Sequence, residues 1–262
     1  MSWQDLPADL RRLIEAEAGA FVGAEQLGTG HNCLLGMVMH TTHDRYFLKG
    51  VPSDHKRAVW TQSNEAAINP HIRHVSAPLV FHVAAVGWDV LGFRSLDAQH
   101  ADMSPGSPDL PKITASLQAL ASIPAPDRLT LRTAEDRWRN YAGDHAHLLA
   151  GTTVAHTDLH RHNILIEGTA KFIDWAWPTL AAPWFDTASV GLQLIRAGHT
   201  PKDAELWCQN FPAFAEATNQ AVTTFVTAAR GLWAEIATTD PQPWKVEVAD
   251  AADVWAGYRD LR

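Results

Sequence analysis

A chain of 262 residues is longer than a typical single domain but too short for two large independent ones, which favours one domain with two lobes. Apolar residues make up 46% of the chain and charged residues 19%, a balance that excludes a disordered protein. The net charge of -8, without a run of lysine or arginine, argues against nucleic-acid binding through phosphate contacts.

Cysteine usage and terminal composition point to a reducing compartment. Cys33 and Cys208 lack the spacing of a zinc site or a disulfide framework. The N-terminal residues do not form a basic segment followed by an apolar one, so we expect no secretory signal. The most apolar late segment, 221–236, is shorter than the about 20 residues that a membrane span needs. We therefore predict a cytoplasmic protein without a membrane segment.

The first third of the chain is predicted to be β-rich. Helical spacing of apolar residues predicts helices over 5–18 and 57–72. A turn is expected at 84–86. The β-prone segments, bounded by turn residues, are 21–27, 34–40, 46–51, 78–82 and 86–91. The first three of these indicate an antiparallel meander, which the helix over 57–72 follows.

The remaining two thirds are predicted to be mainly helical. The polar segment 93–111 contains three prolines and a glycine and is a candidate connector between lobes. Helices are expected at 111–122 and 134–149, with three or four more from 185 onward. Two short apolar runs, 163–166 and 170–173, flank Glu167-Gly168 and predict a hairpin. The expected fold is α+β and bilobal, with a β-rich part at 1–92 and a helical part at 93–262.

The segment 156–174 carries the clearest chemistry. Transfer of a γ-phosphoryl group requires a carboxylate beside the acceptor hydroxyl, oxygen ligands for magnesium and cations on the phosphates. Asn163 follows Asp158 by five residues, the interval of the kinase catalytic loop, and Asp174 ends the predicted hairpin. We predict that Asp158 is the catalytic base and that Asn163 and Asp174 bind magnesium.

Two other interpretations of this segment stay open. A single Asp or Asn near a turn is usually a cap or a turn residue. A transition-metal site such as zinc is the second possibility, although it leaves Asn163 and Asp174 without a role. Its ligands would be His156, Asp158, His160 and His162.

The β-rich part contains candidates for holding phosphates, in the order that a kinase requires. Gly28 and Gly30 lie between two predicted strands, where a glycine turn lets backbone amides approach phosphates. Lys49 lies in the strand at 46–51, and Glu65 follows sixteen residues later on the predicted helix. A Lys–Glu pair of this kind positions the α- and β-phosphates in kinases.

Together these residues resemble the aminoglycoside phosphotransferase family, the small-molecule relatives of protein kinases. The family's loop has the form His-Gly-Asp-Leu-His-x-x-Asn-Ile-Leu and is followed by Ile-Asp-Trp. The matching residues are His156, Asp158, Leu159, His160, Asn163, Ile164, Leu165, Ile173, Asp174 and Trp175. Thr157 stands in place of the usual glycine, and Arg161-His162 in place of a common Pro-Gly. The resemblance implies a protein-kinase-like fold with ATP, or GTP, and magnesium as cofactors.

The resemblance also implies roles for residues around the loop. His156 and His160 would support the loop, and Asp186, twelve residues after Asp174, would brace it. The nucleotide would lie at a hinge near 88–94, where the backbone of Leu91 and Phe93 would contact adenine.

The acceptor is expected to be a small hydroxylated molecule. The chain lacks the extended segment ending in Ala-Pro-Glu on which protein kinases dock a peptide. In the C-terminal helices, carboxylates for ammonium groups and aromatic faces for sugar rings are candidate contacts. These candidates are Asp203, Glu205, Glu235 and Trp244. The predicted acceptor is an aminoglycoside-like antibiotic. The alternatives are a sugar, choline or nucleoside-like metabolite and, in another class, a nucleotide-binding pseudokinase that acts as an interaction module.

Overall fold

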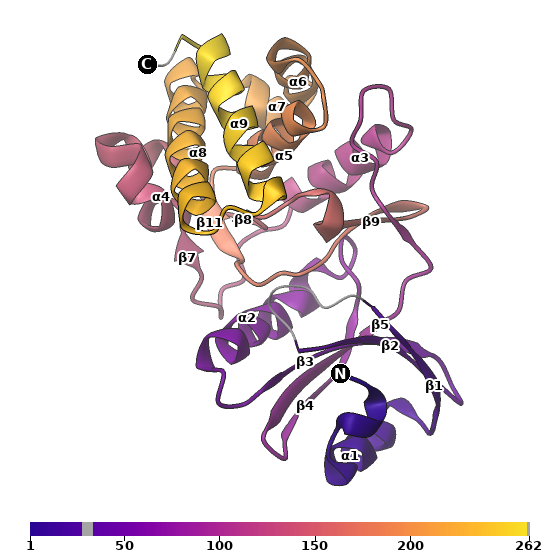
Figure 1. The fold of residues 1–262 in the computed structure, drawn as a ribbon. Coiled ribbons are helices and arrows are strands. Elements are labelled where there is room, and N and C mark those ends of the chain that lie inside the picture. Colours follow the sequence, from indigo (N-terminus) through magenta and orange to yellow (C-terminus); the bar gives the residue numbers. More distant parts are fainter. Residues whose placement is uncertain (28–33, 261–262) are drawn as a thin grey trace. The chain divides into compact units, whose positions relative to one another are not determined.

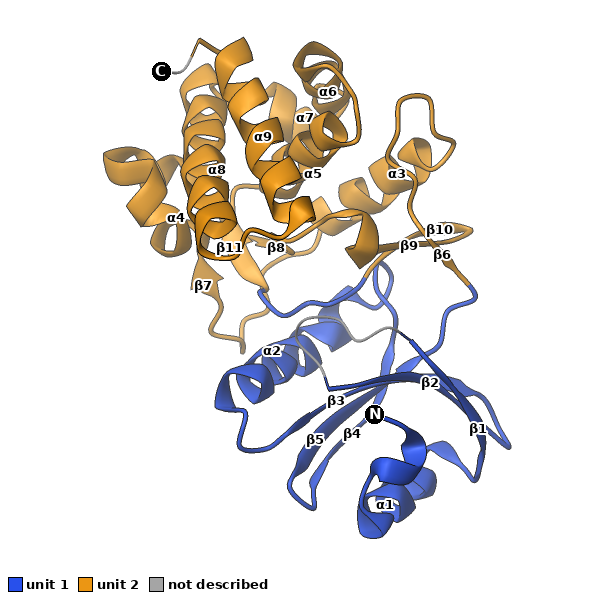
Figure 2. Ribbon diagram, viewed as in Figure 1, with its two compact units in different colours: residues 1–97, 173–177 blue, residues 98–172, 178–262 orange. Residues whose placement is uncertain are grey.

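The computed structural model describes residues 1–27 and 34–260. The chain divides into two compact units, residues 1–97 with 173–177 and residues 98–172 with 178–262 (Figure 2). The first unit thus continues past residue 92 and includes the segment around Asp174, which was assigned to the second part from the sequence. Among the residues that the structure describes, no helix is long and apolar enough to cross a membrane.

The first unit is built on a five-stranded antiparallel sheet with the strand order β1-β2-β3-β5-β4 (Figure 1). The first three strands form the expected meander, and the hairpin of the last two pairs with β3. The described elements in chain order are η1 (Trp3–Asp5), α1 (Ala8–Ala18), β1 (Phe21–Gln26), β2 (Leu35–Thr41), β3 (Arg45–Pro52), α2 (Lys56–Ile72), β4 (Leu79–Ala85) and β5 (Trp88–Arg94).

The two faces of this sheet are covered by different helices. Because side chains alternate along a strand, neighbours in β3 and β5 point to opposite faces. Leu48 and Val90 belong to the core that α1 covers, with Leu10 and Ile14 from that helix. The opposite face holds a second core of Leu91 and Phe93, against which Phe47 of β3 and Ala66 of α2 pack. This alternation places Lys49 on the face that α2 covers.

The turn between β4 and β5 differs from the prediction. Strand β4 extends to Ala85 and β5 begins at Trp88, so the expected turn at 84–86 is wrong. The turn residues are Val86 and Gly87, with φ values of 54° and 75°. Two positive φ values are characteristic of a tight two-residue hairpin turn, whose twist matches that of the strands. Val86 gives no sequence signal for this conformation, because β-branched residues rarely adopt it.

The second unit combines small sheets with a helical bundle, in which α8 and α9 run side by side (Figure 1). Its sheets have the strand orders β10-β9-β6 and β7-β11-β8. Its described elements are β6 (Gln99–His100), α3 (Leu110–Ala121), β7 (Arg132–Thr133), α4 (Ala134–Ala142), η2 (Gly143–Leu149), β8 (Thr153–Ala155), η3 (Arg161–Asn163), β9 (Ile164–Glu167), β10 (Thr169–Phe172), β11 (Thr179–Ala181), α5 (Phe185–Arg196), α6 (Pro201–Cys208), α7 (Pro212–Ala215), α8 (Asn219–Thr239) and α9 (Pro243–Tyr258).

Two helix predictions in this unit are corrected. The helix expected over 134–149 ends at Ala142, because Gly143 adopts a φ of 56° and begins a 3-10 helix. A residue with positive φ is a common end to an α-helix, and glycine adopts it without strain. In the part of the chain that the structure describes, five α-helices follow residue 184, where three or four were expected.

The predicted hairpin is confirmed. Strands β9 and β10 pair in antiparallel register from Glu167 opposite Thr169 to Ile164 opposite Phe172. Gly168 between them has a φ of 68°, which explains the need for glycine at the turn. The hairpin follows Asn163 directly, and Asp174 comes two residues after its end.

Gly92→Ala in β5 is expected to lower the free energy of unfolding by about 1–3 kcal/mol, because overpacking a filled site displaces its neighbours. A Cβ at this position would lie 2.1 Å from the ring of Phe81 on β4. Gly23→Ala in β1 is the matched control, since its Cβ would meet nothing within 4 Å. Urea unfolding followed by circular dichroism measures both variants, and equal stability of the two would contradict the packing described.

His82→Gln is expected to destabilise the protein more at about pH 6 than at about pH 8. The hydrogen bond to Asp89, 3.0 Å from His82 Nε2, raises the pKa of His82 against the opposing effect of burial. Its contribution to stability is therefore complete below the unfolded-state pKa of about 6.5 and is lost as the pH rises through the folded-state pKa.

Unfolding free energies across this pH range test the pair. His71→Gln removes an exposed histidine and is the control. A His82→Gln deficit that does not shrink as the pH rises would contradict the assigned pair.

Candidate active site

The loop from His156 to Asn163 connects β8 to the hairpin and is fixed by one buried carboxylate. Asp186, in the first turn of α5, accepts hydrogen bonds from the backbone N–H groups of His156 at 2.6 Å and Thr157 at 2.8 Å. Burial raises the pKa of Asp186 to about 6, and the two backbone hydrogen bonds and Arg137 oppose this shift. The structure therefore brings Asp186 to the loop that it was predicted to brace.

Two histidines support the same loop through their Nδ1 atoms. The N–H of Asp158 donates to Nδ1 of buried His156 at 3.3 Å. The N–H of His162 donates to Nδ1 of His160 at 3.2 Å, which caps the short helix η3. Since both Nδ1 atoms accept, each neutral ring carries its proton on Nε2. These hydrogen bonds explain the presence of both histidines in the loop without a role in proton transfer.

Asn163 is buried, and its amide nitrogen donates to the backbone oxygen of Asp158 at 2.9 Å. This bond uses the donor end of the amide, so the side-chain oxygen is the atom that can serve as a cation ligand. The bond also joins the two residues that are predicted to carry the chemistry.

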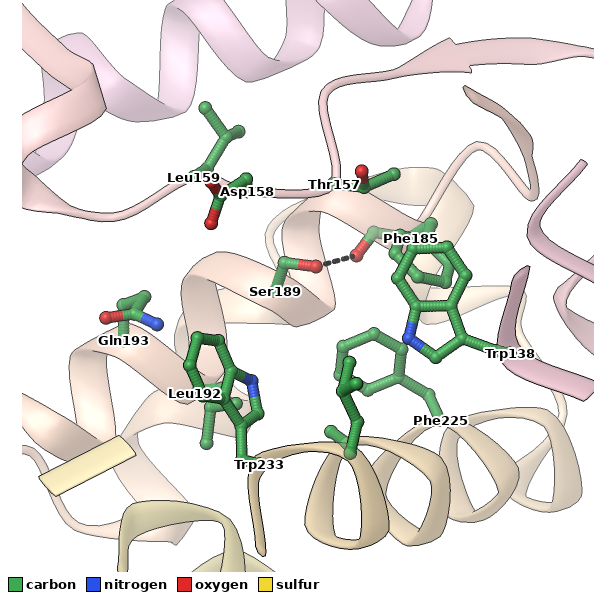
Figure 3. A pocket seen from close by; sticks show the side chains of 12 residues that line it. Trp138, Thr157, Asp158, Leu159, Phe185, Ser189, Leu192, Gln193, Phe225 and Trp233 are labelled. Carbon is green, nitrogen blue, oxygen red and sulfur yellow. Dashed lines mark hydrogen bonds between the residues drawn. The ribbon is translucent and has the colours of Figure 1, made fainter. Parts of the chain in front are cut away.

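Asp158 lies at a pocket of about 50 Å³ in the second unit, and its carboxylate points toward the space between α5 and α8 (Figure 3). The carboxylate is 41% exposed. The pocket is formed by the loop and by residues of α4, α5 and α8. Its lining residues are Trp138, Thr157, Asp158, Leu159, Phe185, Ser189, Leu192, Gln193, Phe225, Ala229, Leu232 and Trp233.

The walls of this pocket are mainly aromatic and aliphatic. Of the twelve lining residues, Asp158 alone carries a formal charge. Trp138 contacts Phe185 edge-on at a centroid distance of 4.8 Å, and Phe185 contacts Phe225 at 5.1 Å. Such a site suits a molecule with an apolar surface, with Asp158, Ser189 and Gln193 as the polar contacts.

The acidic residues predicted to contact the acceptor are not among these lining residues. Asp203 pairs with Thr200 at the start of α6. Glu205 accepts from Trp255 Nε1 at 2.7 Å and Arg259 Nε at 2.6 Å. Both carboxylates therefore stabilise helix packing and capping.

Glu235 and Trp244 also lie outside the pocket lining. Glu235 accepts a hydrogen bond from the hydroxyl of Tyr141 at 2.9 Å. Trp244 contacts the rings of Trp233 and His160 at centroid distances of 6.0 Å. It thus supports a lining residue and a loop residue.

The first unit holds a buried ion-pair cluster. Lys49 Nζ lies 2.6 Å from Glu65 Oε2 and 2.6 Å from Asp174 Oδ1. The side chains of Lys49 and Glu65 are 9% and 5% exposed, whereas Asp174 is 33% exposed. Burial alone lowers the pKa of Lys49, but the two carboxylates outweigh this effect and raise it, so the ammonium is charged at neutral pH.

Glu65 also fixes the segment that carries Asp174. Its Oε1 accepts from the backbone N–H of Trp175 at 3.1 Å while its Oε2 pairs with Lys49. Asp174 has a φ of 61°, a left-handed conformation that Asp tolerates better than most residues. The structure therefore brings Lys49, Glu65 and Asp174 together from three distant segments of the chain.

The other predicted nucleotide contacts lie within a paired strand or outside the described residues. Gly28 and Gly30 belong to segment 28–33, outside the described part of the chain. Leu91 and Phe93 lie inside β5, which pairs with both β3 and β4. Both residues thus lie within the sheet, and their backbone contact with adenine stays a prediction. Strand β5 ends at Arg94, and the N–H of Ser95 still donates to the backbone oxygen of Arg45 at 3.0 Å.

The arrangement of side chains in the histidine-rich loop does not favour the alternative of a transition-metal site. Across residues 1–27 and 34–260, no group of three or more His, Cys, Asp or Glu side chains is arranged to hold a metal ion. Magnesium is commonly held by one or two protein oxygens together with phosphates, so the amide oxygen of Asn163 and the part-exposed Asp174 fit its chemistry.

Arg137 is a site residue that the sequence did not reveal. It lies on α4, and its Nη1 donates to the hydroxyls of Thr157 at 2.7 Å and Thr179 at 2.5 Å. An arginine on an amphipathic helix usually faces solvent, so its sequence position gives no sign of this role. The sequence does offer one indirect sign of a partner for the loop: Thr157 has a hydroxyl where the resembled family has glycine.

Lys49→Met is expected to lower the free energy of unfolding by about 3–5 kcal/mol, because it leaves buried Glu65 without its counter-charge. The double variant Lys49→Met/Glu65→Gln should recover part of this loss. Lys202→Met, at an exposed position of α6, is the control. Urea unfolding would contradict the cluster if Lys49→Met and Lys202→Met proved equally stable.

Comparison with known proteins extends these observations. No curated protein sequence matches the chain. Choline kinase LicA from Streptococcus pneumoniae has a similar structure, with a TM-score of 0.66 and 15% identity over 96% of this chain and 100% of that one. A putative fructosamine-3-kinase from Haemophilus somnus gives a TM-score of 0.58 with 10% identity, over 92% and 95% of the chains.

An aminoglycoside phosphotransferase from Streptomyces rimosus, in complex with ADP and streptomycin, is a third structural neighbour. It gives a TM-score of 0.57 with 15% identity, over 85% of this chain and 98% of that one. At such low identities the structural likeness establishes a common fold. A model of the phosphotransferase enzyme family matches residues 91–233, more than half of the chain. The chain therefore belongs to the phosphotransferase enzyme family and has a protein-kinase-like α+β fold.

Proposed function

We propose that this phosphotransferase moves the γ-phosphoryl group of ATP to a hydroxyl group of a small molecule. The observation that carries the proposal is the position of Asp158, whose carboxylate reaches a pocket from a loop held by Asp186 and Asn163. A carboxylate in such a position can orient and deprotonate an acceptor hydroxyl.

The residues divide the chemistry between them. Asp158 accepts the proton of the acceptor hydroxyl as the oxygen attacks the γ-phosphorus of ATP; the bond from this phosphorus to the β,γ-bridging oxygen breaks, and ADP leaves. Lys49, held by Glu65, neutralises charge on the nucleotide phosphates. Asn163 and Asp174 are the proposed ligands of magnesium, which when bound screens the phosphate charge. This ligand assignment depends on sequence spacing and on the oxygen atoms that the two side chains offer.

The pocket favours an acceptor with an apolar surface over a polycationic one. A molecule with several ammonium groups needs several carboxylates, and Asp158 is the charged residue among those lining the pocket. Aromatic walls from α4, α5 and α8 instead suit an apolar group or a single cation. We therefore place a metabolic alcohol or a weakly charged antibiotic ahead of an aminoglycoside.

Asp158→Asn is expected to lower kcat by about 100- to 10,000-fold, because the amide cannot accept the hydroxyl proton. The affinity for ATP should stay near that of the wild type, since no role in nucleotide binding is proposed for Asp158. Coupled ADP-release assays and isothermal titration with magnesium-ATP measure the two quantities. Asp253→Asn, on the surface of α9, is the control. Wild-type turnover in Asp158→Asn would refute its assignment as the base.

The acceptor class is tested by an ADP-release screen with Asp158→Asn as the blank. The panel contains aminoglycosides, macrolides, nucleosides, sugars and amino alcohols. We expect the highest kcat/KM among acceptors with at most one positive charge and an apolar part. A polycationic aminoglycoside as the best acceptor would contradict this expectation.

The pseudokinase alternative makes the opposite prediction. Lys49, Glu65, Asp174, Asp158 and Asn163 are all present, which favours catalysis over a purely binding role. Binding of ATP without magnesium, and without transfer to any acceptor or to water, would favour the interaction module.

A further inference from the structure

Thr157 has a backbone conformation that its side chain disfavours. Its φ is 67°, in the left-handed region where β-branched residues are rare and glycine is common. The resembled loop has glycine at this position, so here a side chain is retained despite the conformational strain. Strain of this kind persists where surrounding contacts hold the residue in place.

Contacts on both sides of Thr157 hold this conformation. Its N–H donates to Asp186 Oδ1 at 2.8 Å, and its hydroxyl accepts from Arg137 Nη1 at 2.7 Å. The same Nη1 donates to the hydroxyl of Thr179 on β11 at 2.5 Å. The hydroxyl thus joins the loop to α4 and β11, a connection that glycine could not make.

Arg137 is itself held in place and remains charged. Its guanidinium lies over the ring of Trp138 at 4.4 Å from the ring centre. Burial lowers the pKa of Arg137 to about 10, and the charges of Asp158 and Asp186 oppose this shift. At neutral pH a cation therefore lies beside the loop, within the electrostatic influence of Asp158.

The same segment of α4 also forms a wall of the pocket. Trp138 follows Arg137 directly and lines the pocket together with Thr157 and Asp158. A displacement of Arg137 would therefore shift both the loop and the pocket wall that faces Asp158.

We propose that Arg137 is a positioning residue that, through the hydroxyl of Thr157, fixes the catalytic loop so that Asp158 faces the acceptor. The inference rests on the proposed role of Asp158 as the base. The positioning contact replaces the conformational freedom of glycine by a fixed hydrogen bond. It acts on the chemical step and leaves nucleotide binding unchanged.

Three single substitutions test the contact. Thr157→Val keeps the shape and removes the acceptor, Thr157→Gly also removes the strain, and Arg137→Met removes the donor. Each is expected to lower kcat by about 10- to 100-fold with the KM for ATP within about 2-fold of wild type. Thr157→Ser should recover much of the kcat that Thr157→Val loses. Arg139→Met, on the exposed side of the same helix, is the control.

A double-variant cycle separates positioning from a merely structural effect. The kcat of Arg137→Met/Thr157→Val should be no lower than that of the slower single variant, because both changes break the same hydrogen bond between Arg137 and Thr157. Wild-type kcat in Thr157→Gly or Thr157→Val, or multiplied losses in the double variant, would overturn the inference. Circular dichroism at the assay temperature confirms that each variant compared is folded.

Hydrogen–deuterium exchange gives a readout that needs no acceptor. In Thr157→Val and Arg137→Met the amides of His156 and Thr157 should exchange at least about 10-fold faster than in the wild type. Unchanged exchange in both variants would overturn the inference. Asp158→Asn separates failure of the proposed function from failure of this inference. Full turnover in Asp158→Asn refutes the proposed base. Loss of turnover in Asp158→Asn together with normal turnover in Thr157→Val refutes the positioning role alone.

Discussion

The loop from His156 to Asn163, which carries the proposed base, depends on the carboxylate of Asp186, which accepts two adjacent backbone N–H groups at 2.6 and 2.8 Å. A buried carboxylate is unfavourable unless it is hydrogen-bonded, and the N-terminal turn of α5 adds a favourable helix dipole. These donors fix the backbone at His156 and Thr157. The orientation of Asp158, the next residue, follows from theirs. One acidic side chain on a helix thus helps to fix where the carboxylate of Asp158, the proposed base, lies.

The first unit uses the same device. Glu65 accepts the backbone N–H of Trp175 while it pairs with Lys49, as Asp186 accepts the N–H of Thr157. In both places the anchored backbone N–H belongs to, or directly follows, a residue with positive φ, Thr157 at 67° and Asp174 at 61°. Left-handed residues carry conformational strain, and a charged acceptor on a neighbouring helix offsets it. Each unit therefore holds an aspartate of the proposed site through a carboxylate from a helix.

The sequence was sufficient to predict the hairpin at 164–172, since two apolar runs around Gly168 leave few other choices. It also predicted the pairing of Lys49 with Glu65, because a lysine on a strand followed by a glutamate on the next helix matches the Lys–Glu pair of kinases. It could not predict Arg137 or the true ends of β5, which depend on tertiary packing. Local sequence shows that Glu205 is a carboxylate. It does not show that Trp255 of α9 and Arg259, which follows that helix, both donate hydrogen bonds to it.

The pocket lining comes from separate segments of the chain, which can change independently in evolution. Asp158 comes from the loop, whereas Phe225, Ala229, Leu232 and Trp233 of α8 form a separate wall. On the proposed function, substitutions along α8 would change the surface that faces the acceptor and leave Asp158 in place. The proposed function thus assigns specificity and chemistry to different segments of the chain, which can change in sequence independently.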